Sequence, residues 1–211
     1  MTGQRLHHDL FLIAHDKSGK PLAHRSATSL ALAGAVLIDL VLAGRVSLTG
    51  GPAVVVGRSA TGDAVTDGLL TLIAGDRLGH DAPYWIRTLA EQDVHDRTRE
   101  ALVAAGLLVP VTRRRLGMLP YLRHEPADIA LLVRASAGVR SAAEGRKSPD
   151  ARSAALCGLM AVLQIERALY LGLPSLNERL RALATGHSPL VKELIGMVDT
   201  LVGEAAVAVY R

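Results

Sequence analysis

The residues of this 211-residue chain with the clearest chemical potential are basic side chains that could bind an anion. No catalytic motif accompanies them. The sequence has no phosphate-binding glycine loop, no HExxH zinc motif and no GxSxG nucleophile elbow. Basic residues gather at 113–115 with Arg123, at Arg134 and Arg140, and at 146–147. Such clusters can hold a phosphate group through charge-assisted hydrogen bonds, or they can simply form a solvated surface. The sequence therefore supports no enzyme, and we assign no catalytic residue.

Other reactive residue types are weaker candidates. The eight histidines are scattered, and the side chains of the adjacent pair His7–His8 would point to opposite faces of a strand. Because tetrahedral metal sites need ligands grouped in space, we expect no metal site. Cys157 lies in an apolar helical run and is expected to be a buried structural thiol. Asp39 interrupts an apolar helix, so we expect it to be buried and paired with an arginine or with backbone N–H groups rather than to be catalytic.

Composition predicts an aliphatic, helical core. Apolar residues make up 49% of the chain and aromatic residues only 3%, a mixture that suits helices better than β-sandwiches. A single cysteine excludes a disulfide scaffold, and the formal charge of +4 is compatible with an anionic partner. The most apolar stretch, residues 30–44, contains Asp39 and is too short to span a membrane, and the first residues lack the features of a signal peptide. We therefore expect one cytoplasmic domain over residues 1–211 with no cofactor, and peripheral membrane contact stays open.

The spacing of apolar residues predicts a mainly α-helical bundle with one or two short β-hairpins. Residues 9–14 are predicted to form a strand or a short helix before a turn at 16–20. One hairpin is expected around Gly50–Gly51–Pro52 and another from Leu107 to Arg123, with Arg113 to Arg115 at its exposed tip. The helices are expected at 28–43, 69–74, 84–91, 93–105, 126–143, 148–170, 175–186 (opened by a capping box at Ser175) and from 188 onward.

Four passages of the sequence, taken in order, resemble one known family. They are LFLIAHD followed by Gly19, GAVLIDLVLAGR at 34–45, Trp85–Ile86 with Leu89 followed by residues 97–108, and Ser148–Pro149–Asp150 before Ala-Ala-Leu at 154–156. Together they span almost the whole chain, and their order and spacing resemble the Golgi phosphoprotein 3 (GPP34) family, which has many bacterial members.

The resemblance implies a fold and a set of partners. The fold would be a mostly helical domain with a projecting hairpin, here Leu107 to Arg123, through which copies of the chain can associate. Eukaryotic members bind phosphatidylinositol 4-phosphate on a flat basic face, sit peripherally on Golgi membranes and hold the cytoplasmic tails of glycosyltransferases. The implied partners are therefore an anionic lipid head group or membrane surface, together with a protein.

The resemblance also implies where a lipid would bind, on residues that this chain partly replaces. The family's tryptophan after the opening turn and its arginine early in the next helix fall on His24 and Ala33. Its second basic pair falls near Arg134 and Arg140. We therefore predict an anion-binding site formed by His24, Arg25, Arg134 and Arg140, with little selectivity among phosphoinositides.

A winged-helix nucleic-acid-binding protein is the alternative function. The helices expected at 84–91 and 94–105 precede a basic hairpin, which is the order of elements in such a domain. Asp93, Asp96 and Glu100 would however face the phosphates unfavourably, which argues against nucleic acid as the partner.

Overall fold

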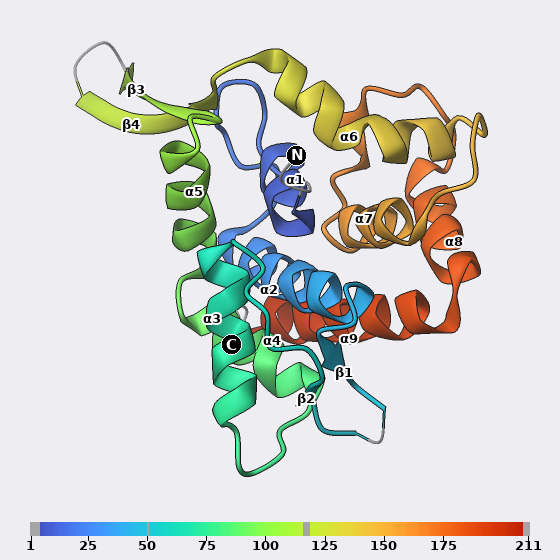
Figure 1. The fold of residues 1–211 in the computed structure, drawn as a ribbon. Helices are drawn as coiled ribbons and strands as arrows, with labels where there is room; N and C mark the ends of the chain where they lie inside the picture. Colours follow the sequence, from blue (N-terminus) through green and yellow to red (C-terminus); the bar gives the residue numbers. More distant parts are fainter. Residues whose placement is uncertain (1–4, 50, 116–118, 209–211) are drawn as a thin grey trace.

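Nine α-helices and two small antiparallel sheets make up the residues that the structure describes, a computed structural model covering 5–49, 51–115 and 119–208 (Figure 1). The expected mainly α-helical class with short hairpins is confirmed. The helices are α1 (Leu6–Ile13), α2 (Arg25–Leu42), α3 (Ala64–Gly75), α4 (Ala82–Glu91), α5 (Val94–Ala104), α6 (Ile129–Ala143), α7 (Ala151–Val162), the 3₁₀ helix η1 (Glu166–Leu169), α8 (Leu176–His187) and α9 (Pro189–Ala208).

Helix α2 is the centre of the fold. It contacts α1, α3, α4, α5, α7 and α9, and every residue from Thr28 to Leu40 is buried. A helix that is apolar on all sides needs such an environment, because no face of it can be left to water. By length and composition α2 could also cross a membrane, but its packing among six helices makes it the core helix here. In Figure 1 the blue α2 lies beside the red α9 across the middle of the bundle.

Two glycines allow α9 to approach its neighbours closely. A Cβ atom on Gly34 of α2 would lie 2.4 Å from Cγ2 of Val198, and one on Gly158 of α7 would lie 2.7–2.9 Å from three side-chain carbons of Ile195. Real Cβ atoms do not come this close to other heavy atoms, so these two positions have no room for a larger residue. The close approach brings α2, α7 and α9 together as the inner part of the bundle.

Both expected hairpins are present. Strand β1 (Val46–Ser47) pairs with β2 (Val54–Val55), and β3 (Leu108–Arg115) pairs with β4 (Leu119–Pro126). The second hairpin projects from the bundle at the upper left of Figure 1. Its register places Arg113 opposite Tyr121 and Arg114 opposite Pro120. The prediction of an arginine tip is therefore wrong: these arginines belong to β3, and the connection at 116–118 lies outside the described residues, as does Gly50 of the first hairpin.

The residues that cap the helix N-termini differ from the expected ones at three helices. Helix α2 begins at Arg25, three residues early, because Nδ1 of His24 accepts a hydrogen bond from the Ser26 N–H at 3.4 Å. Asp93 and Ser175 do precede helices, but both have left-handed backbones, with φ of 54° and 49°, and neither side chain accepts a capping hydrogen bond. The capping box expected at Ser175 is therefore absent.

In two segments the observed helices differ from the elements expected from the sequence. The first apolar unit is helical rather than extended, and α1 covers Leu6–Ile13. The helix expected at 148–170 ends at Val162 instead. Gln164 then has a left-handed backbone with φ of 55°, and η1 follows as a separate short helix. This break turns Tyr170 out into solvent, where it is 82% exposed.

Substitution of Gly158 by alanine should lower the free energy of unfolding by about 1–3 kcal/mol, because the added methyl group overpacks against Ile195. Gly196→Ala in α9 is the matched control, since nothing lies within 4 Å of its added Cβ. There the gain in helix propensity should raise stability by up to about 1 kcal/mol. Urea unfolding of the two variants measures both effects, and equal responses would contradict the close α7–α9 packing.

Candidate functional site

The structure distributes the four predicted anion-binding residues over three cavities. His24 and Arg25 line a cavity of about 630 Å³ among the start of α2, α4 and α9. Arg134 lines a second cavity of about 490 Å³ beside α1 and the start of α3. Arg140 lines a third of about 490 Å³ beside the turn that follows α1. None of these three cavities is lined by more than two of the four residues, so they do not share one pocket.

The His24–Arg25 cavity already contains its own counter-charges. The guanidinium of Arg25 donates a hydrogen bond to Asp96 at 2.6 Å and lies 3.9 Å from Asp93. On the same cavity wall, Arg87 pairs with Glu204 at 2.7 Å. An anion entering here would have to displace carboxylates from both arginines. The cavity therefore offers little free positive charge.

The same carboxylates weaken the nucleic-acid alternative. On α5, the helix that would have to read DNA, Arg99 pairs with Asp96 at 2.8 Å and with Glu100 at 3.5 Å. Asp96 thus bridges Arg25 and Arg99. A helix that carries three acidic residues at its start, two of them paired with its Arg99, is poorly suited to approach phosphates.

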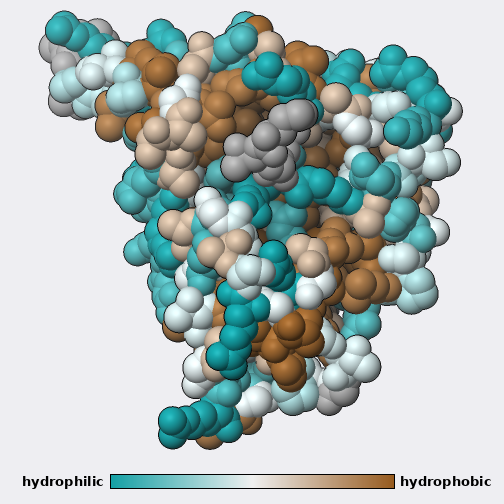
Figure 2. Space-filling model, in the orientation of Figure 1, coloured by the Kyte–Doolittle hydropathy of each residue, from teal (hydrophilic) through white to brown (hydrophobic). Residues whose placement is uncertain are grey.

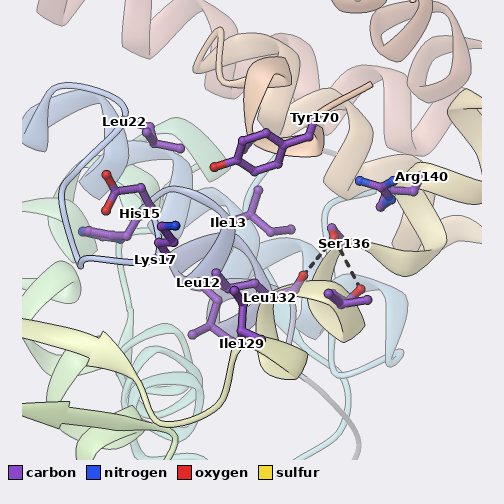
Figure 3. A pocket seen from close by; sticks show the side chains of 13 residues that line it. Leu12, Ile13, His15, Lys17, Leu22, Ile129, Leu132, Ser136, Arg140 and Tyr170 are labelled. Carbon is purple, nitrogen blue, oxygen red and sulfur yellow. Dashed lines mark hydrogen bonds between the residues drawn. The ribbon is translucent and has the colours of Figure 1, made fainter. Parts of the chain in front are cut away.

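The Arg140 cavity combines apolar walls with basic and polar edges (Figure 3). Ile129 and Val133, on the first turns of α6, are 61% and 60% exposed, and Tyr170 is 82% exposed. Exposed large apolar side chains that adjoin one another mark interaction sites more often than ordinary surface. The lining residues are Leu12, Ile13, His15, Asp16, Lys17, Leu22, Ile129, Leu132, Val133, Ser136, Arg140, Ala168 and Tyr170. Figure 2 also shows hydrophobic residues at the surface near the start of α6, beside the hairpin.

Five basic residues surround the turn between α1 and α2, and we call their surface the basic turn face: Lys17, Lys20, Arg123, Arg140 and Arg167. The three arginines donate to backbone carbonyls, Arg123 to Gly19 at 3.3 Å, Arg167 to Leu22 at 3.3 Å and Arg140 to Leu169. No carboxylate of the described residues lies within 4.0 Å of any of the five charged groups. The positive charge of this face is therefore available to a partner.

The turn that carries this face is held in one conformation by local hydrogen bonds. Oδ1 of Asp16 accepts from the backbone N–H groups of Ser18 and Lys20 and from the Ser18 hydroxyl, at 2.7–3.0 Å. Burial tends to raise the pKa of Asp16, but these hydrogen bonds outweigh it and hold the pKa below its usual range. Gly19 has φ of 66° and packs so tightly that a Cβ atom would lie 2.3 Å from the carbonyl oxygen of His124 in β4. The turn is thus anchored to the base of the hairpin.

His15 forms part of the cavity wall as a neutral group. Burial lowers the pKa of its imidazole to about 4, and its Nδ1 lies 2.8 Å from the Phe11 carbonyl oxygen. The ring stacks on Phe11 with 4.3 Å between centroids. At neutral pH the positive charge around this cavity therefore comes from lysine and arginine, not from histidine.

Asp39 lies on the other side of α1 and behaves as predicted. It is buried, and it accepts hydrogen bonds from the Leu6 N–H and from Nη1 of Arg152, both at 2.7 Å. The other guanidinium nitrogen, Nη2, lies 3.6 Å from Asp9, whose pKa burial raises to about 7. Asp39 thereby joins α1, α2 and α7, and both carboxylates of this arrangement are buried.

Cys157 is a buried thiol, as predicted. It is completely buried in α7, and burial raises the pKa of its thiol to about 12. A thiol that stays protonated at physiological pH is a poor nucleophile. Cys157 is therefore a packing residue.

Sequence reasoning missed most of the basic turn face. Lys17 and Lys20 are visible in the sequence as charged residues around the turn glycine. Arg167 comes from η1, and the exposed Tyr170 beside this face comes from the residue after η1. The fold brings these distant residues beside the turn, since Arg167 reaches the Leu22 carbonyl. The only local signal is the charged sequence DKSGK itself.

Comparison with known proteins supports one family. The family model described as Golgi phosphoprotein 3 (GPP34) matches residues 6–205 of the 211. The match covers every described helix except the last residues of α9. No curated protein matches the chain.

Replacement of Asp39 by alanine should lower the free energy of unfolding by about 1–3 kcal/mol, because the Leu6 N–H and the Arg152 guanidinium lose their partner. Asp199→Ala removes a comparable pair with Arg181 at a half-exposed site. It should cost less than about 1 kcal/mol, as surface ion pairs do. Chemical denaturation of both variants compares the two, and an Asp39 variant as stable as the wild type would refute the buried role.

The low pKa of His15 predicts a specific loss of stability in acid. The unfolded chain protonates this imidazole below about pH 6.5, whereas the folded protein keeps it neutral down to about pH 4. Protons therefore favour the unfolded chain, and the free energy of unfolding should fall by roughly 3 kcal/mol between these pH values on account of this group. Unfolding measured across this range should show a weaker pH dependence in His15→Gln than in the wild type. Identical dependences would contradict the buried neutral imidazole.

Proposed function

The chain belongs to the Golgi phosphoprotein 3 (GPP34) family, and from this premise we propose that it is a non-enzymatic module that binds anionic membrane surfaces peripherally. The lipid phosphates and carboxylates would meet the basic turn face, on the cytoplasmic side of a membrane. Two observations support this proposal. No carboxylate of the described residues pairs with the five cations around the turn, and two of these cations line one cavity with three exposed apolar side chains.

The physical basis is the sum of two modest interactions. Each lysine or arginine near an anionic bilayer contributes about 1 kcal/mol, and salt screens this attraction within a Debye length of about 8 Å. Apolar and aromatic side chains beside the cations add burial in the interfacial layer, where tyrosine is a favoured residue. Ile129, Val133 and Tyr170 occupy this position next to Lys17 and Arg140. Neither interaction is strong alone, but together they suit reversible peripheral binding.

The four residues predicted to bind an anion would contribute unequally to membrane binding. Arg140 lies on the basic turn face and would contact the head groups. Arg134 is exposed on α6 and lines the neighbouring cavity with Arg5, where it would add to the positive field. His24 and Arg25 would not contribute, because the carboxylates around them neutralise their cavity. Charges spread around a turn give little shape recognition, so we propose weak selectivity among phosphoinositides.

The projecting hairpin is the proposed place for a protein partner or a second copy of the chain. Val109, Tyr121 and Leu122 on its strands are 40–59% exposed, and the family resemblance gives self-association to this element. The hairpin stands off the bundle in Figure 1, so a partner could reach its outer end, while Arg123 at its base belongs to the basic turn face.

Vesicle binding should fall when charge is removed from the basic turn face. The variant Lys17→Gln/Lys20→Gln should bind phosphatidylserine-containing vesicles roughly 30-fold more weakly than the wild type, as expected for about 2 kcal/mol. Co-sedimentation at low and high salt measures this, and wild-type binding should largely disappear at high salt. Arg58→Gln/Arg77→Gln removes the same charge from exposed positions outside this face and is the matched control.

The outcomes separate the proposal from its competitors. Equal weakening by the control variant would show that net charge, not this face, determines binding. Selective binding of phosphatidylinositol 4-phosphate that persists at high salt would contradict a site of dispersed charges. Absence of vesicle binding at any salt would refute the membrane proposal, and a DNA shift assay under the same salt titration tests the nucleic-acid alternative.

A further inference from the structure

We propose that His7, His8 and Asp63 form a binding site for a divalent transition-metal ion, with zinc the ion that this ligand set fits best. The two imidazoles come from the start of α1, and the carboxylate comes from the residue before α3. Two histidines and one carboxylate are a common protein ligand set for zinc with an open fourth position.

The spacing of the three groups matches metal ligands better than hydrogen-bonded partners. Nε2 of His7 lies 3.5 Å from Oδ1 of Asp63, and Nε2 of His8 lies 3.4 Å from Oδ2. The candidate ligand atoms all lie within 4.8 Å of one another. Two atoms bound at about 2.0–2.1 Å from a tetrahedral ion are about 3.3–3.4 Å apart, whereas an N–H···O hydrogen bond spans about 2.7–3.2 Å.

The histidines are also unsatisfied as buried polar groups. His7 is completely buried, and neither of its ring nitrogens has a hydrogen-bond partner among the described residues. Nε2 of His8 is likewise buried without a hydrogen bond. Buried polar atoms are almost always paired, so two imidazole nitrogens that converge on one carboxylate require an explanation. A cation between them would satisfy both.

Surrounding groups hold the ligands in place as metal sites require. Oδ1 of Asp63 accepts hydrogen bonds from the Thr66 N–H at 2.8 Å and the Thr66 hydroxyl at 2.7 Å, which fixes the carboxylate. Nδ1 of His7 faces the carboxylate of Asp39 at 4.0 Å. At this distance Asp39 makes no hydrogen bond to the ring, and it contributes negative charge behind the ligand.

The charge of the surroundings favours a cation at this position. Asp63, Asp39 and Asp9 face the cluster from three elements. The opposing cations are Arg152 of α7 and, on the adjoining cavity, Arg5 and Arg134. Negative charge close to the imidazoles favours a metal ion, which competes with protons for the ring nitrogens.

The site has a route to solvent. His8 is 18% exposed on its side chain, and His8 and Asp63 both line the cavity of about 490 Å³ that also contains Arg5 and Arg134. An ion held by the three protein ligands could therefore keep its fourth position on the open side. This inference does not depend on membrane binding, which involves the separate basic turn face.

Zinc titration of untagged, chelator-treated protein tests the proposal. Isothermal titration calorimetry at pH 7.5 should show one equivalent of Zn²⁺ bound, and Zn²⁺ should raise the unfolding temperature. Replacing Zn²⁺ by Co²⁺ should give the visible absorption of a four-coordinate ion. His8→Gln and Asp63→Asn should each weaken binding at least tenfold while circular dichroism shows an intact fold.

His80→Gln is the matched control, because His80 also pairs with an aspartate, Asp76 at 3.1 Å, but has no second histidine beside it. This variant should bind Zn²⁺ like the wild type. The proposal is overturned if the wild type shows no saturable binding of one ion. It is equally overturned if His8→Gln and Asp63→Asn leave the affinity unchanged, or if His80→Gln alone reduces it.

Discussion

The fold depends on the burial of α2 from Thr28 to Leu40, and this burial makes the carboxylate of Asp39 important for stability. Six helices surround this segment and leave no water for a charged side chain, yet Asp39 lies near its end. The charge is tolerated because the Leu6 N–H, at the start of α1, and the Arg152 guanidinium reach it. A buried charge that needs partners fixes the positions of the elements that supply them. The placement of α1, and of everything that α1 carries, follows from this interaction.

Helix α1 in turn separates two surfaces with different chemistry. One end of it leads into the turn of Asp16, with its lysines and arginines and the apolar residues of α6. The other end carries the two histidines that converge on Asp63, next to the Asp39 carboxylate. A short helix of eight residues thus supports both the basic turn face and the buried polar cluster. The family match extends over all of these elements.

Features with local causes could be predicted from the sequence, and features assembled across the chain could not. The buried role of Asp39 follows from its apolar neighbours, and the hairpin at β3–β4 from two β-favouring runs. The arginines at 113–115 were misplaced at the tip because charge was taken to mark the turn, whereas a projecting hairpin exposes both faces and tolerates arginine within a strand.

Arg25 was misjudged for a different reason: the carboxylates that neutralise it come from the α4–α5 junction, about 70 residues away. His7 and His8 were not expected to act together, because adjacent residues diverge on a strand. On a helix they are about 100° apart and can converge on one neighbour.

The contact between Gly19 and the His124 carbonyl has a geometric consequence for the proposed membrane binding. With no side chain between them, the backbones of the turn and of β4 touch directly, and Arg123 adds a hydrogen bond to the Gly19 carbonyl. The hairpin is therefore held in a fixed orientation to the turn and its cations. A molecule lying on a bilayer by the basic turn face would hold its hairpin at one height and one inclination, so that neighbouring molecules would present theirs in a common layer parallel to the membrane.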